Sequence, residues 1–297
     1  MRTVIIDGGG STTDVVLAID GLCVARTSLP TVKPTAIILR TEELCRMLGS
    51  FLATTSVSPD IDITSGLDGV IIGMAGIWTQ AEIHRYHIAV HNSWETYVGT
   101  NAPNIVVMSD AELVLQGAFG RDQGTVLIAG TGSIALSRDS SGALHRCGGW
   151  GARIDDAGGG FWLGRQACKA VARMLDGRGA ATLLIRPIAA YVRADADDHE
   201  SVRVALRSAS IDGVARLGSA VLTYADEGDV VASHIRNSGA TALADLVRGL
   251  SPQQEQRVVA YGSLWRNATY LSAVEHLCDR KVEQIIDLLP AVASRLV

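Results

Sequence analysis

The chain has 297 residues, of which 47% are hydrophobic and 19% carry a charge, and its formal net charge is −5. This composition is typical of a globular protein, and the length is sufficient for two domains. Because the net charge is negative and no basic stripe is found, nucleic acid is excluded as an expected partner.

Membrane and metal-cluster signals are also missing from the sequence. No apolar run approaches the roughly 18 residues of a membrane helix, so we expect no membrane partner. Residues 1–3 lead straight into the first predicted strand and leave no room for a signal peptide, so we expect a cytoplasmic protein. The cysteines form no Cys-x-x-Cys pair, which argues against a disulfide framework or a zinc site. They are Cys23, Cys45, Cys147, Cys168 and Cys278.

The first predicted strand is the apolar run 4–6, and a glycine turn follows it. The turn reads Asp7-Gly8-Gly9-Gly10-Ser11-Thr12-Thr13. Glycines let backbone N–H groups approach an anion closely, and the hydroxyl groups add further donors. Two more apolar runs, 15–19 and 22–25, are separated by Asp20-Gly21, which predicts a β-hairpin.

The rest of the first half alternates helices and strands. Helices are predicted over 35–54, 79–94 and 110–118, and strands over 69–74 and 104–108. This alternation favours parallel strands covered by helices. We place a domain boundary near Phe119, which predicts domains at 1–118 and 119–297.

The second half repeats the opening pattern. The apolar run 126–129 is followed by Gly130-Thr131-Gly132-Ser133, a strand over 134–138 and a turn at Ser140-Ser141-Gly142. The chain is then helical over 161–175 and largely helical to about residue 250. A strand over 256–260, a helix over 270–278 and a strand from 285 that breaks into a terminal helix complete the chain.

A single glycine turn could be an ordinary tight hairpin, but two similar turns predict one nucleotide whose phosphates lie between them. Neither turn is a Walker A motif, because the Gly-x-x-x-x-Gly-Lys-[Ser/Thr] spacing is missing. Neither gives a dinucleotide Gly-x-Gly-x-x-Gly between a strand and a helix. The repeat therefore predicts a duplicated β-hairpin phosphate clamp.

Five motifs in order resemble the superfamily of acetate kinase, sugar kinases, Hsp70 and actin, and within it the N-acetylglucosamine kinase and BadF/BadG ATPase group. The motifs are the two glycine turns, Met108-Ser109-Asp110-Ala111, the segment Cys147-Gly148-Gly149-Trp150-Gly151 with 156–164, and 258–265. The resemblance implies an α/β fold of two ribonuclease-H-like (actin-like ATPase) domains with a cleft between them. It assigns the helical region to an insertion in the C-terminal domain.

The resemblance also implies which residues bind ATP and substrate. Those expected on the nucleotide are Gly9, Gly10, Ser11, Thr12, Thr131, Gly132, Gly262 and Ser263. Those expected on the substrate are Gly148, Gly149, Trp150 and Asp156. Trp150 could instead seal the core, and Asp156 could simply belong to an acidic helix start.

Two carboxylates are expected to carry the chemistry. The resemblance makes Asp110 the general base, although Ser109 and Asp110 are both suited to capping the helix that begins there. Asp7 ends the first strand, where it would hold Mg²⁺ through water. The alternative for Asp7 is a cap on the turn.

The implied function is ATP-dependent phosphorylation of an amino sugar, N-acetylglucosamine or glucosamine, at the 6-hydroxyl. One alternative is a BadF-like ATPase that activates electron transfer, but it needs cysteine pairs for an iron–sulfur cluster. Another is a non-catalytic sugar sensor, which would more naturally lack Asp110 or one glycine turn. The family's sugar-binding Asn is missing from 28–35, where Thr31 and Lys33 are the candidates to replace it. The oligomeric state is left open, with a homodimer as one option.

Overall fold

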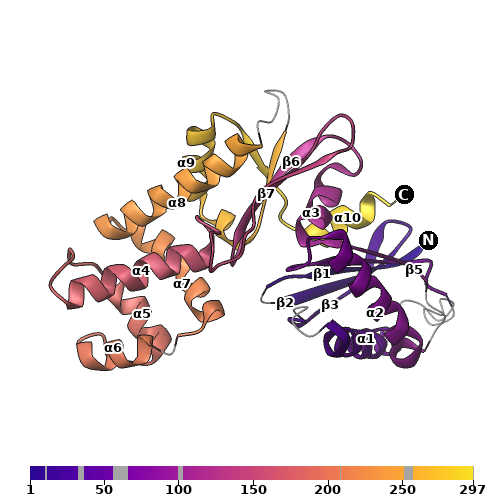
Figure 1. The fold of residues 1–297 in the computed structure, drawn as a ribbon, viewed down its shortest axis with the longest axis horizontal. Coiled ribbons are helices and arrows are strands. Elements are labelled where there is room, and N and C mark those ends of the chain that lie inside the picture. The colour runs from indigo at the N-terminus through magenta and orange to yellow at the C-terminus, as the bar shows by residue number, and fades with distance from the viewer. Residues whose placement is uncertain are drawn as a thin grey trace. The chain divides into compact units, whose positions relative to one another are not determined.

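The computed structural model describes residues 1–10, 12–32, 37–55, 66–99, 103–207, 209–250 and 257–296. It contains two compact units, shown in Figure 1. The first unit comprises Met1–Asp122 and Ile285–Val297, and the second comprises Gln123–Gln284. Each unit is built around its own sheet and is described separately.

The sheet of the first unit has the strand order β3-β2-β1-β4-β5. Its strands are β1 (Arg2–Gly8), β2 (Thr12–Ile19), β3 (Leu22–Pro30), β4 (Gly69–Met74) and β5 (Asn104–Ser109). The first three strands are antiparallel neighbours, whereas β4 and β5 run parallel to β1. Asp20 and Gly21 both have positive φ, 48° and 78°, which two-residue hairpin turns require, so the predicted hairpin is confirmed.

Helices cover both faces of this first sheet (Figure 1). They are α1 (Ile37–Thr54), α2 (Gln80–Val98), α3 (Asp110–Phe119) and α10 (Leu288–Ser294). Val4 and Ile6 share one buried cluster with Tyr86 and Trp94 of α2. On β4, Gly73 makes room for Leu113 of α3, because a Cβ at Gly73 would lie 2.5 Å from the Leu113 Cβ.

The sheet of the second unit repeats the same arrangement, with the order β10-β9-β6-β7-β8. Its strands are β6 (Gly124–Ala129), β7 (Ser133–Arg138), β8 (Leu144–Gly148), β9 (Val258–Tyr261) and β10 (Val282–Gln284). Again the first three are antiparallel neighbours, and β9 and β10 run parallel to β6. The predicted α/β class and the duplicated strand pattern are therefore confirmed.

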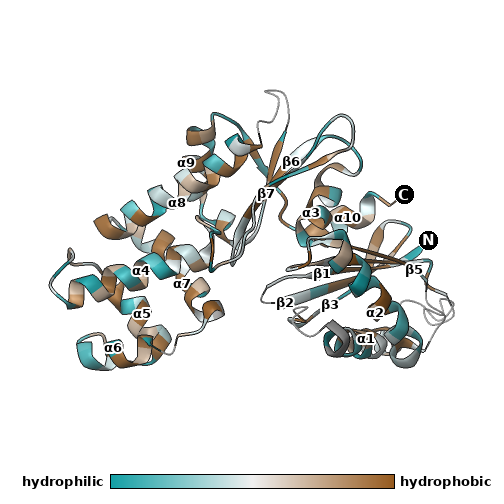
Figure 2. Cartoon of the chain, viewed as in Figure 1, coloured by the Kyte–Doolittle hydropathy of each residue, from teal (hydrophilic) through white to brown (hydrophobic). Residues whose placement is uncertain are grey.

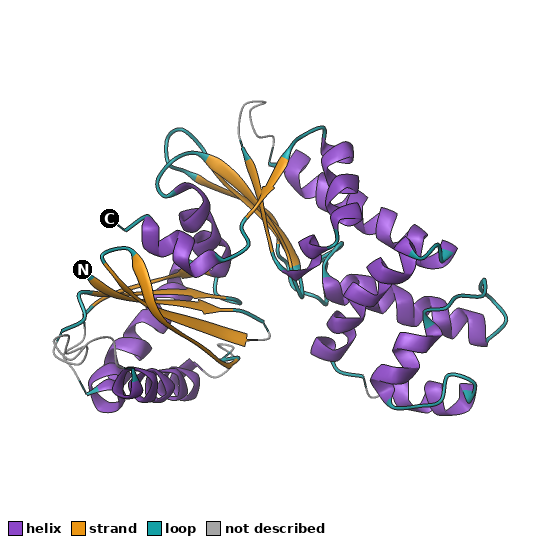
Figure 3. Cartoon of the chain, turned by 180° about the vertical axis from the view of Figure 1, so that it is seen from behind, coloured by secondary structure: helices purple, strands orange, loops and turns teal. Residues whose placement is uncertain are grey.

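A block of helices separates β8 from β9 in the second unit, as Figure 3 shows in purple. It consists of α4 (Gly160–Leu175), α5 (Ile185–Val192), α6 (His199–Leu206), α7 (Ile211–Asp226) and α8 (Val230–Gly249). The 3-10 helix η2 (Ser263–Arg266) and α9 (Ala268–Cys278) follow β9. Apolar side chains of these helices form one core with the sheet, and polar residues alternate with them along the ribbon in Figure 2. Among the described helices, none is both long and apolar enough to cross a membrane.

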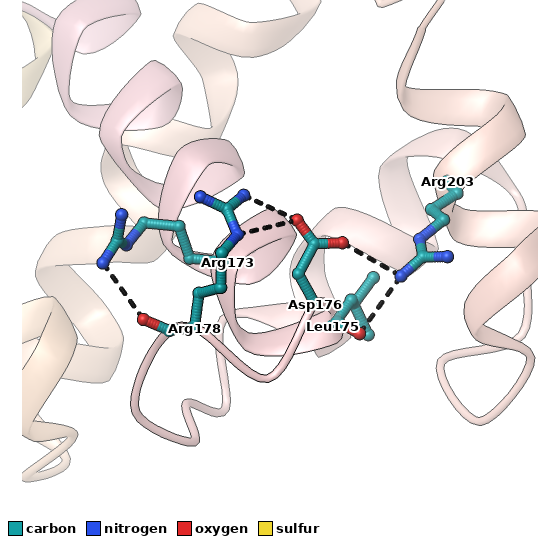
Figure 4. Close-up of polar contacts among 5 residues, drawn as sticks. All are labelled: Arg173, Leu175, Asp176, Arg178 and Arg203. Atoms are coloured by element: carbon teal, nitrogen blue, oxygen red, sulfur yellow. Dashed lines mark hydrogen bonds and ion pairs between the residues drawn. The ribbon is translucent and has the colours of Figure 1, made fainter.

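A carboxylate ties the C-terminal end of α4 to α6 (Figure 4). Asp176 accepts hydrogen bonds from Arg178 Nη2 at 2.6 Å and from Arg203 Nη2 of α6 at 3.1 Å. Arg203 Nη2 also donates to the Leu175 carbonyl at 3.1 Å. The hydrogen bond from the Arg178 side chain is the main cause of the lowered pKa of the Asp176 carboxyl. These contacts fix the C-terminal end of α4. The first turn of the same helix lies beside the second glycine turn.

The structure divides the chain differently from the domains 1–118 and 119–297 expected from the sequence. The first unit continues to Asp122, and α10 returns to it. The reason is packing on α3, where a Cβ at Gly117 would lie 2.8 Å from Leu288 Cδ1. Arg295 Nη2 also donates to the Ala118 carbonyl at 3.1 Å. The last strand lies three residues earlier than expected, at Val282–Gln284 instead of starting at 285.

Candidate nucleotide and substrate site

The carboxyl ends of three parallel strands lie at one edge of the first sheet. The register pairs Gly8 of β1 with Met74 of β4, and Met74 with Ser109 of β5. Asp7 is buried one residue before the end of β1, and Asp110 follows directly after β5. Ligands of open α/β sheets bind at this edge, so the fold brings both predicted carboxylates to a ligand-binding position.

Ser109, not Asp110, caps α3. The Ser109 hydroxyl accepts from the Glu112 N–H at 3.2 Å, and Glu112 Oε2 accepts from the Ser109 N–H at 2.8 Å. This reciprocal pair is a capping box. Asp110 occupies the first helical position, is half-buried, and accepts from the Ala111 N–H through Oδ1 at 2.8 Å. The N-cap alternative for Asp110 is therefore wrong.

The first glycine turn is held in place by its neighbours. The Thr31 hydroxyl donates to the Gly9 carbonyl at 2.9 Å, and the Ala75 N–H donates to the Gly8 carbonyl at 2.8 Å. Thr12 begins β2 with an exposed side chain. Thr31 was expected from the sequence only as a contact to the sugar, but it also supports the first glycine turn.

Two residues named in the sequence analysis for this region, Ser11 and Lys33, lie outside the described residues. Gly10 is described and lies in the bend that precedes Ser11. Together with Gly9 it forms the described part of the first turn.

The second glycine turn links β6 to β7 and lies against the start of α4. The Gly160 N–H donates to the Gly130 carbonyl at 2.8 Å, and the Phe161 N–H donates to the Thr131 carbonyl at 2.9 Å. Within the turn, the Gly130 N–H donates to the Gly132 carbonyl at 3.0 Å. No pattern in the sequence indicates the part played by Gly160 and Phe161, because it depends on a tertiary contact.

Gly262 and Ser263 lie beside this second turn. Strand β9 runs parallel to β6 and pairs Tyr261 with Ile128, so Gly262 reaches the same sheet edge as Gly130. Gly262 has a φ of 123°, and a Cβ there would lie 2.3 Å from the Ala129 carbonyl oxygen. Only glycine fits this position. Gly262 is the N-cap of η2, and the side chain of Ser263, the first residue of that helix, is exposed.

Asp156 packs directly against the second turn. A Cβ on Gly132 would lie 2.3 Å from Asp156 Oδ2, and the other oxygen, Oδ1, accepts from the Gly151 N–H at 3.0 Å. Asp156 is buried and has a φ of 55°, a left-handed conformation that is uncommon for a non-glycine residue. Burial raises the pKa of its carboxyl. The structure therefore joins the predicted substrate segment to the predicted phosphate turn.

Gly148 and Gly149 end β8 next to the same turn. Gly148 pairs with Ile134, and the Gly149 N–H donates to the Ser133 carbonyl at 3.1 Å. Trp150 follows with 64% of its surface exposed, so the alternative that it seals the core is wrong. The Arg146 guanidinium carbon lies 5.2 Å from the Trp150 ring centroid, a cation–π distance.

The predicted site residues thus form two groups. Asp7, Gly9 and Asp110 share one edge of the first sheet, with Gly10 and Thr12 in the adjoining turn. The residues of the second unit gather around the turn between β6 and β7. The members of this second group are Thr131, Gly132, Gly148, Gly149, Asp156 and Gly262. A cavity of about 500 Å³ among the helices of the second unit, lined by Met174, Leu175 and Arg186 among others, includes none of the predicted site residues.

The first edge offers a donor set that suits Mg²⁺. In the described part of the chain, no group of three or more His, Cys, Asp or Glu side chains is arranged to hold a metal ion. Mg²⁺ does not need such a cage, because it keeps several waters and is bound by one or two carboxylates together with substrate phosphates. The Asp7 carboxylate beside a glycine turn fits that mode of binding.

Comparisons with known proteins agree with this architecture. A curated N-acetylmuramic acid/N-acetylglucosamine kinase of Clostridium acetobutylicum is 31% identical over 172 residues, which cover 56% of this chain and 56% of that protein. An N-acetyl-D-glucosamine kinase of Dictyostelium discoideum is 27% identical over 191 residues, which cover 64% of this chain and 58% of that protein. The matched region therefore spans little more than half the length of these relatives.

Solved structures extend the likeness to the whole fold. A protein from Chromobacterium violaceum assigned as an N-acetylglucosamine kinase superposes with a TM-score of 0.77 at 22% identity, covering 99% of this chain and 98% of its own. The model of the BadF/BadG/BcrA/BcrD ATPase family matches residues 6–293, nearly the full length. The chain therefore belongs to the BadF/BadG/BcrA/BcrD ATPase family.

Proposed function

We propose that this protein is an ATP-dependent sugar kinase, and that its acceptor is the 6-hydroxyl of an amino sugar, N-acetylglucosamine or glucosamine. The observation that carries the proposal is that Asp110 lies at the same sheet edge as Asp7, one strand apart, while Ser109 caps the helix. The kinases among the relatives support the same class of reaction.

In this proposal the two glycine turns bind the phosphates of ATP. Backbone N–H groups of Gly9, Gly10, Thr131 and Gly132 would approach the phosphate oxygens, which glycine permits because no Cβ intervenes. Gly262 and Ser263 would lie on the adenosine side. Asp7 would hold Mg²⁺, which supplies positive charge to the phosphate oxygens when it is bound.

Asp110 would act as the general base. Its carboxylate would accept the proton of the sugar hydroxyl as the oxygen bonds to the γ-phosphorus and the bond to the ADP oxygen breaks. The products are a sugar phosphate and ADP, and the proton remains on Asp110 until it exchanges with solvent. The short hydrogen bond from the Ala111 N–H restrains the carboxylate at the helix start.

The substrate would contact the second unit through Asp156 and the segment 148–150. The buried Asp156 carboxylate would accept from sugar hydroxyls, and the exposed Trp150 ring would cover an apolar face of the pyranose. Aromatic rings present a large apolar surface at low entropic cost. Thr31 stays a candidate for the distal hydroxyls as an acceptor, because its own O–H already donates to the Gly9 carbonyl.

An ATPase that activates electron transfer is the competing function within the family. Such an activator needs cysteine pairs that hold an iron–sulfur cluster. The five cysteines of this chain are free thiols scattered over both units, and burial raises the pKa of Cys45 to about 12. A thiol in that state is a poor metal ligand because the thiolate is the binding form.

The test is ADP release measured with a coupled assay over a panel of sugars. We expect slow ATP hydrolysis without sugar and an acceleration of about 10²-fold or more with the right amino sugar, because the acceptor completes the catalytic arrangement. The panel should contain glucosamine, N-acetylglucosamine, N-acetylmannosamine, N-acetylmuramic acid and glucose. Rapid turnover that ignores every sugar, and that Asp156→Ala leaves unchanged, would overturn the kinase proposal in favour of the ATPase.

A further inference from the structure

The first turn of α4 forms hydrogen bonds to the backbone of the second glycine turn. The N–H groups of Gly160 and Phe161 donate to the carbonyls of Gly130 and Thr131. The first N–H groups of a helix have no partner within the helix, and the N-cap, Gly159, has no side chain to supply one. The carbonyls of the glycine turn therefore act as the cap of α4.

This capping fixes the direction of two peptide groups. In a trans peptide the C=O of one residue and the N–H of the next point to opposite sides. Because the Gly130 and Thr131 carbonyls face α4, the N–H groups of Thr131 and Gly132 face away from it. Successive N–H groups on one side of a turn form an anion-binding concavity. Helix α4 thus orients the amides that the proposed function assigns to phosphate.

The position of the first turn of α4 is in turn set by α7. A Cβ on Gly218 of α7 would lie 2.7 Å from the Gly160 Cα and 2.8 Å from the Gly160 carbonyl oxygen. One turn further along, a Cβ on Gly164 would lie 2.0 Å from the Val214 carbonyl oxygen. These neighbours are backbone atoms, which cannot rotate away as a side chain can. The two helices therefore meet backbone to backbone.

Two further helices, α8 and α9, contact the segment that leads into α4. The hydroxyl of Tyr270 in α9 is buried and donates to the Gly158 carbonyl at 2.8 Å. Gly158 has a φ of 85°, and a Cβ there would lie 2.7 Å from the Gly239 carbonyl oxygen of α8. The segment before α4 is therefore held by α8 and α9, which restrains the position of the first turn of α4.

We propose that Gly218 and Phe161 are positioning residues for the phosphates of the bound nucleotide, Phe161 through its backbone N–H. This inference rests on the proposed ATP binding. Gly218 sets the place of Gly160 through direct backbone contact. Gly160 and Phe161 hold the second glycine turn so that its Thr131 and Gly132 amides face the phosphates. Neither Gly218 nor Phe161 needs to touch the nucleotide.

The first test is Gly218→Ala, with binding of ADP and of adenosine measured by titration calorimetry. A methyl group at this position must push the first turn of α4 away from α7 and displace the glycine turn that is bonded to it. We therefore expect ADP affinity to fall about tenfold, the equivalent of one charged hydrogen bond. Adenosine lacks phosphates, and its affinity should change by no more than about twofold. Ser219→Ala, at the exposed neighbouring position of α7, is the matched control and should leave both affinities unchanged. Equal losses for ADP and adenosine would indicate a general structural effect and overturn the proposal.

A second pair of variants tests the positioning role of the Phe161 N–H even if Gly218→Ala does not fold. Phe161→Pro removes the N–H that holds the Thr131 carbonyl, and proline is tolerated in the first turn of a helix. Phe161→Ala removes the ring but keeps the N–H. We expect the proline variant to bind ADP about five- to tenfold more weakly than the alanine variant. Equal ADP affinities would overturn the positioning role alone, whereas a wild-type chain that binds no ADP would overturn the proposed function and this inference with it.

Discussion

The two sheets have the same strand order but different chemistry at their ligand-binding edges. When β1 and β6 are aligned so that the buried Thr3 and Thr125 match, the position of Asp7 in β1 corresponds to that of Ala129 in β6. The helix that follows the last strand of each sheet begins with Asp110 in one case and with the buried Leu288 in the other. Both carboxylates therefore belong to the first repeat, and the second repeat has apolar residues in their place.

The two glycine turns are also supported in different ways. The first is held by a side chain as well as by backbone, since the Thr31 hydroxyl donates to the Gly9 carbonyl and the Ala75 N–H donates to the Gly8 carbonyl. At the second, the backbone N–H groups of Gly160 and Phe161 donate to the Gly130 and Thr131 carbonyls. The duplicated scaffold thus carries Asp7 and Asp110 at the sheet edge of its first repeat, whereas the second repeat holds its glycine turn against the start of a helix. The following substitutions test that difference.

The largest effect is expected for Asp110→Asn. The amide cannot accept the hydroxyl proton, so kcat should fall by about 10²-fold or more while ATP binding and the melting temperature stay close to those of the wild type. The matched control is Asp287→Asn, at the start of the equivalent helix, where the carboxylate only pairs with Arg26 at 2.7 Å on the surface. Steady-state kinetics of both variants give the answer. Similar kcat values for the two would mean that Asp110 has a structural role only.

An intermediate effect is expected for Thr131→Val in the second turn. The valine keeps the shape but removes the hydroxyl, so we expect the KM for ATP to rise about tenfold with little change in the KM for the sugar. Thr131→Ser restores the hydroxyl and should bring the KM for ATP back toward the wild-type value. An equal rise in both KM values for Thr131→Val would point to a folding defect rather than to lost phosphate contact.

The smallest effect is expected for Asp156→Asn, and it concerns thermal stability. Burial raises the pKa of this carboxyl, so the wild type loses stability as the pH rises from the ordinary Asp range, near 3.9, through the raised pKa. Asparagine tolerates the left-handed backbone and avoids that loss. We expect the variant to melt at or slightly above the wild-type temperature at pH 7, with the difference vanishing toward pH 4, while the KM for the sugar rises. Thermal melts at both pH values check this, and a clear drop in melting temperature at pH 7 would contradict it.

The local elements could be predicted from the sequence because short-range physics determines them. Asp20 and Gly21 tolerate positive φ, so the hairpin between β2 and β3 was predictable from two residues. The second turn with its flanking strands was equally visible, since apolar runs predict buried strands and glycines predict the break between them. The position of Asp110 directly after a buried strand predicted a place at the edge of an open sheet, whereas its expected role as the base was implied by the family resemblance.

Capping was harder to assign, although its residues are close in sequence. Ser109 and Asp110 both suit an N-cap, and only the Glu112 side chain returning to the Ser109 N–H shows which residue takes that role. Likewise, Trp150 could have been a core residue, because a tryptophan between glycines has no periodic pattern that fixes its exposure.

The sequence by itself determined the α/β order, the two glycine turns and the carboxylates Asp7 and Asp110 at the ends of two strands. Only the tertiary structure decided that α10 packs on α3 of the first unit, that Asp156 lies against Gly132, and that Gly218 meets Gly160 backbone to backbone. The physical reason is the range of the interactions. A turn is fixed by the φ preferences of two or three consecutive residues. Each of these three contacts instead joins residues that are far apart in the chain and depends on a glycine that leaves room for its neighbour.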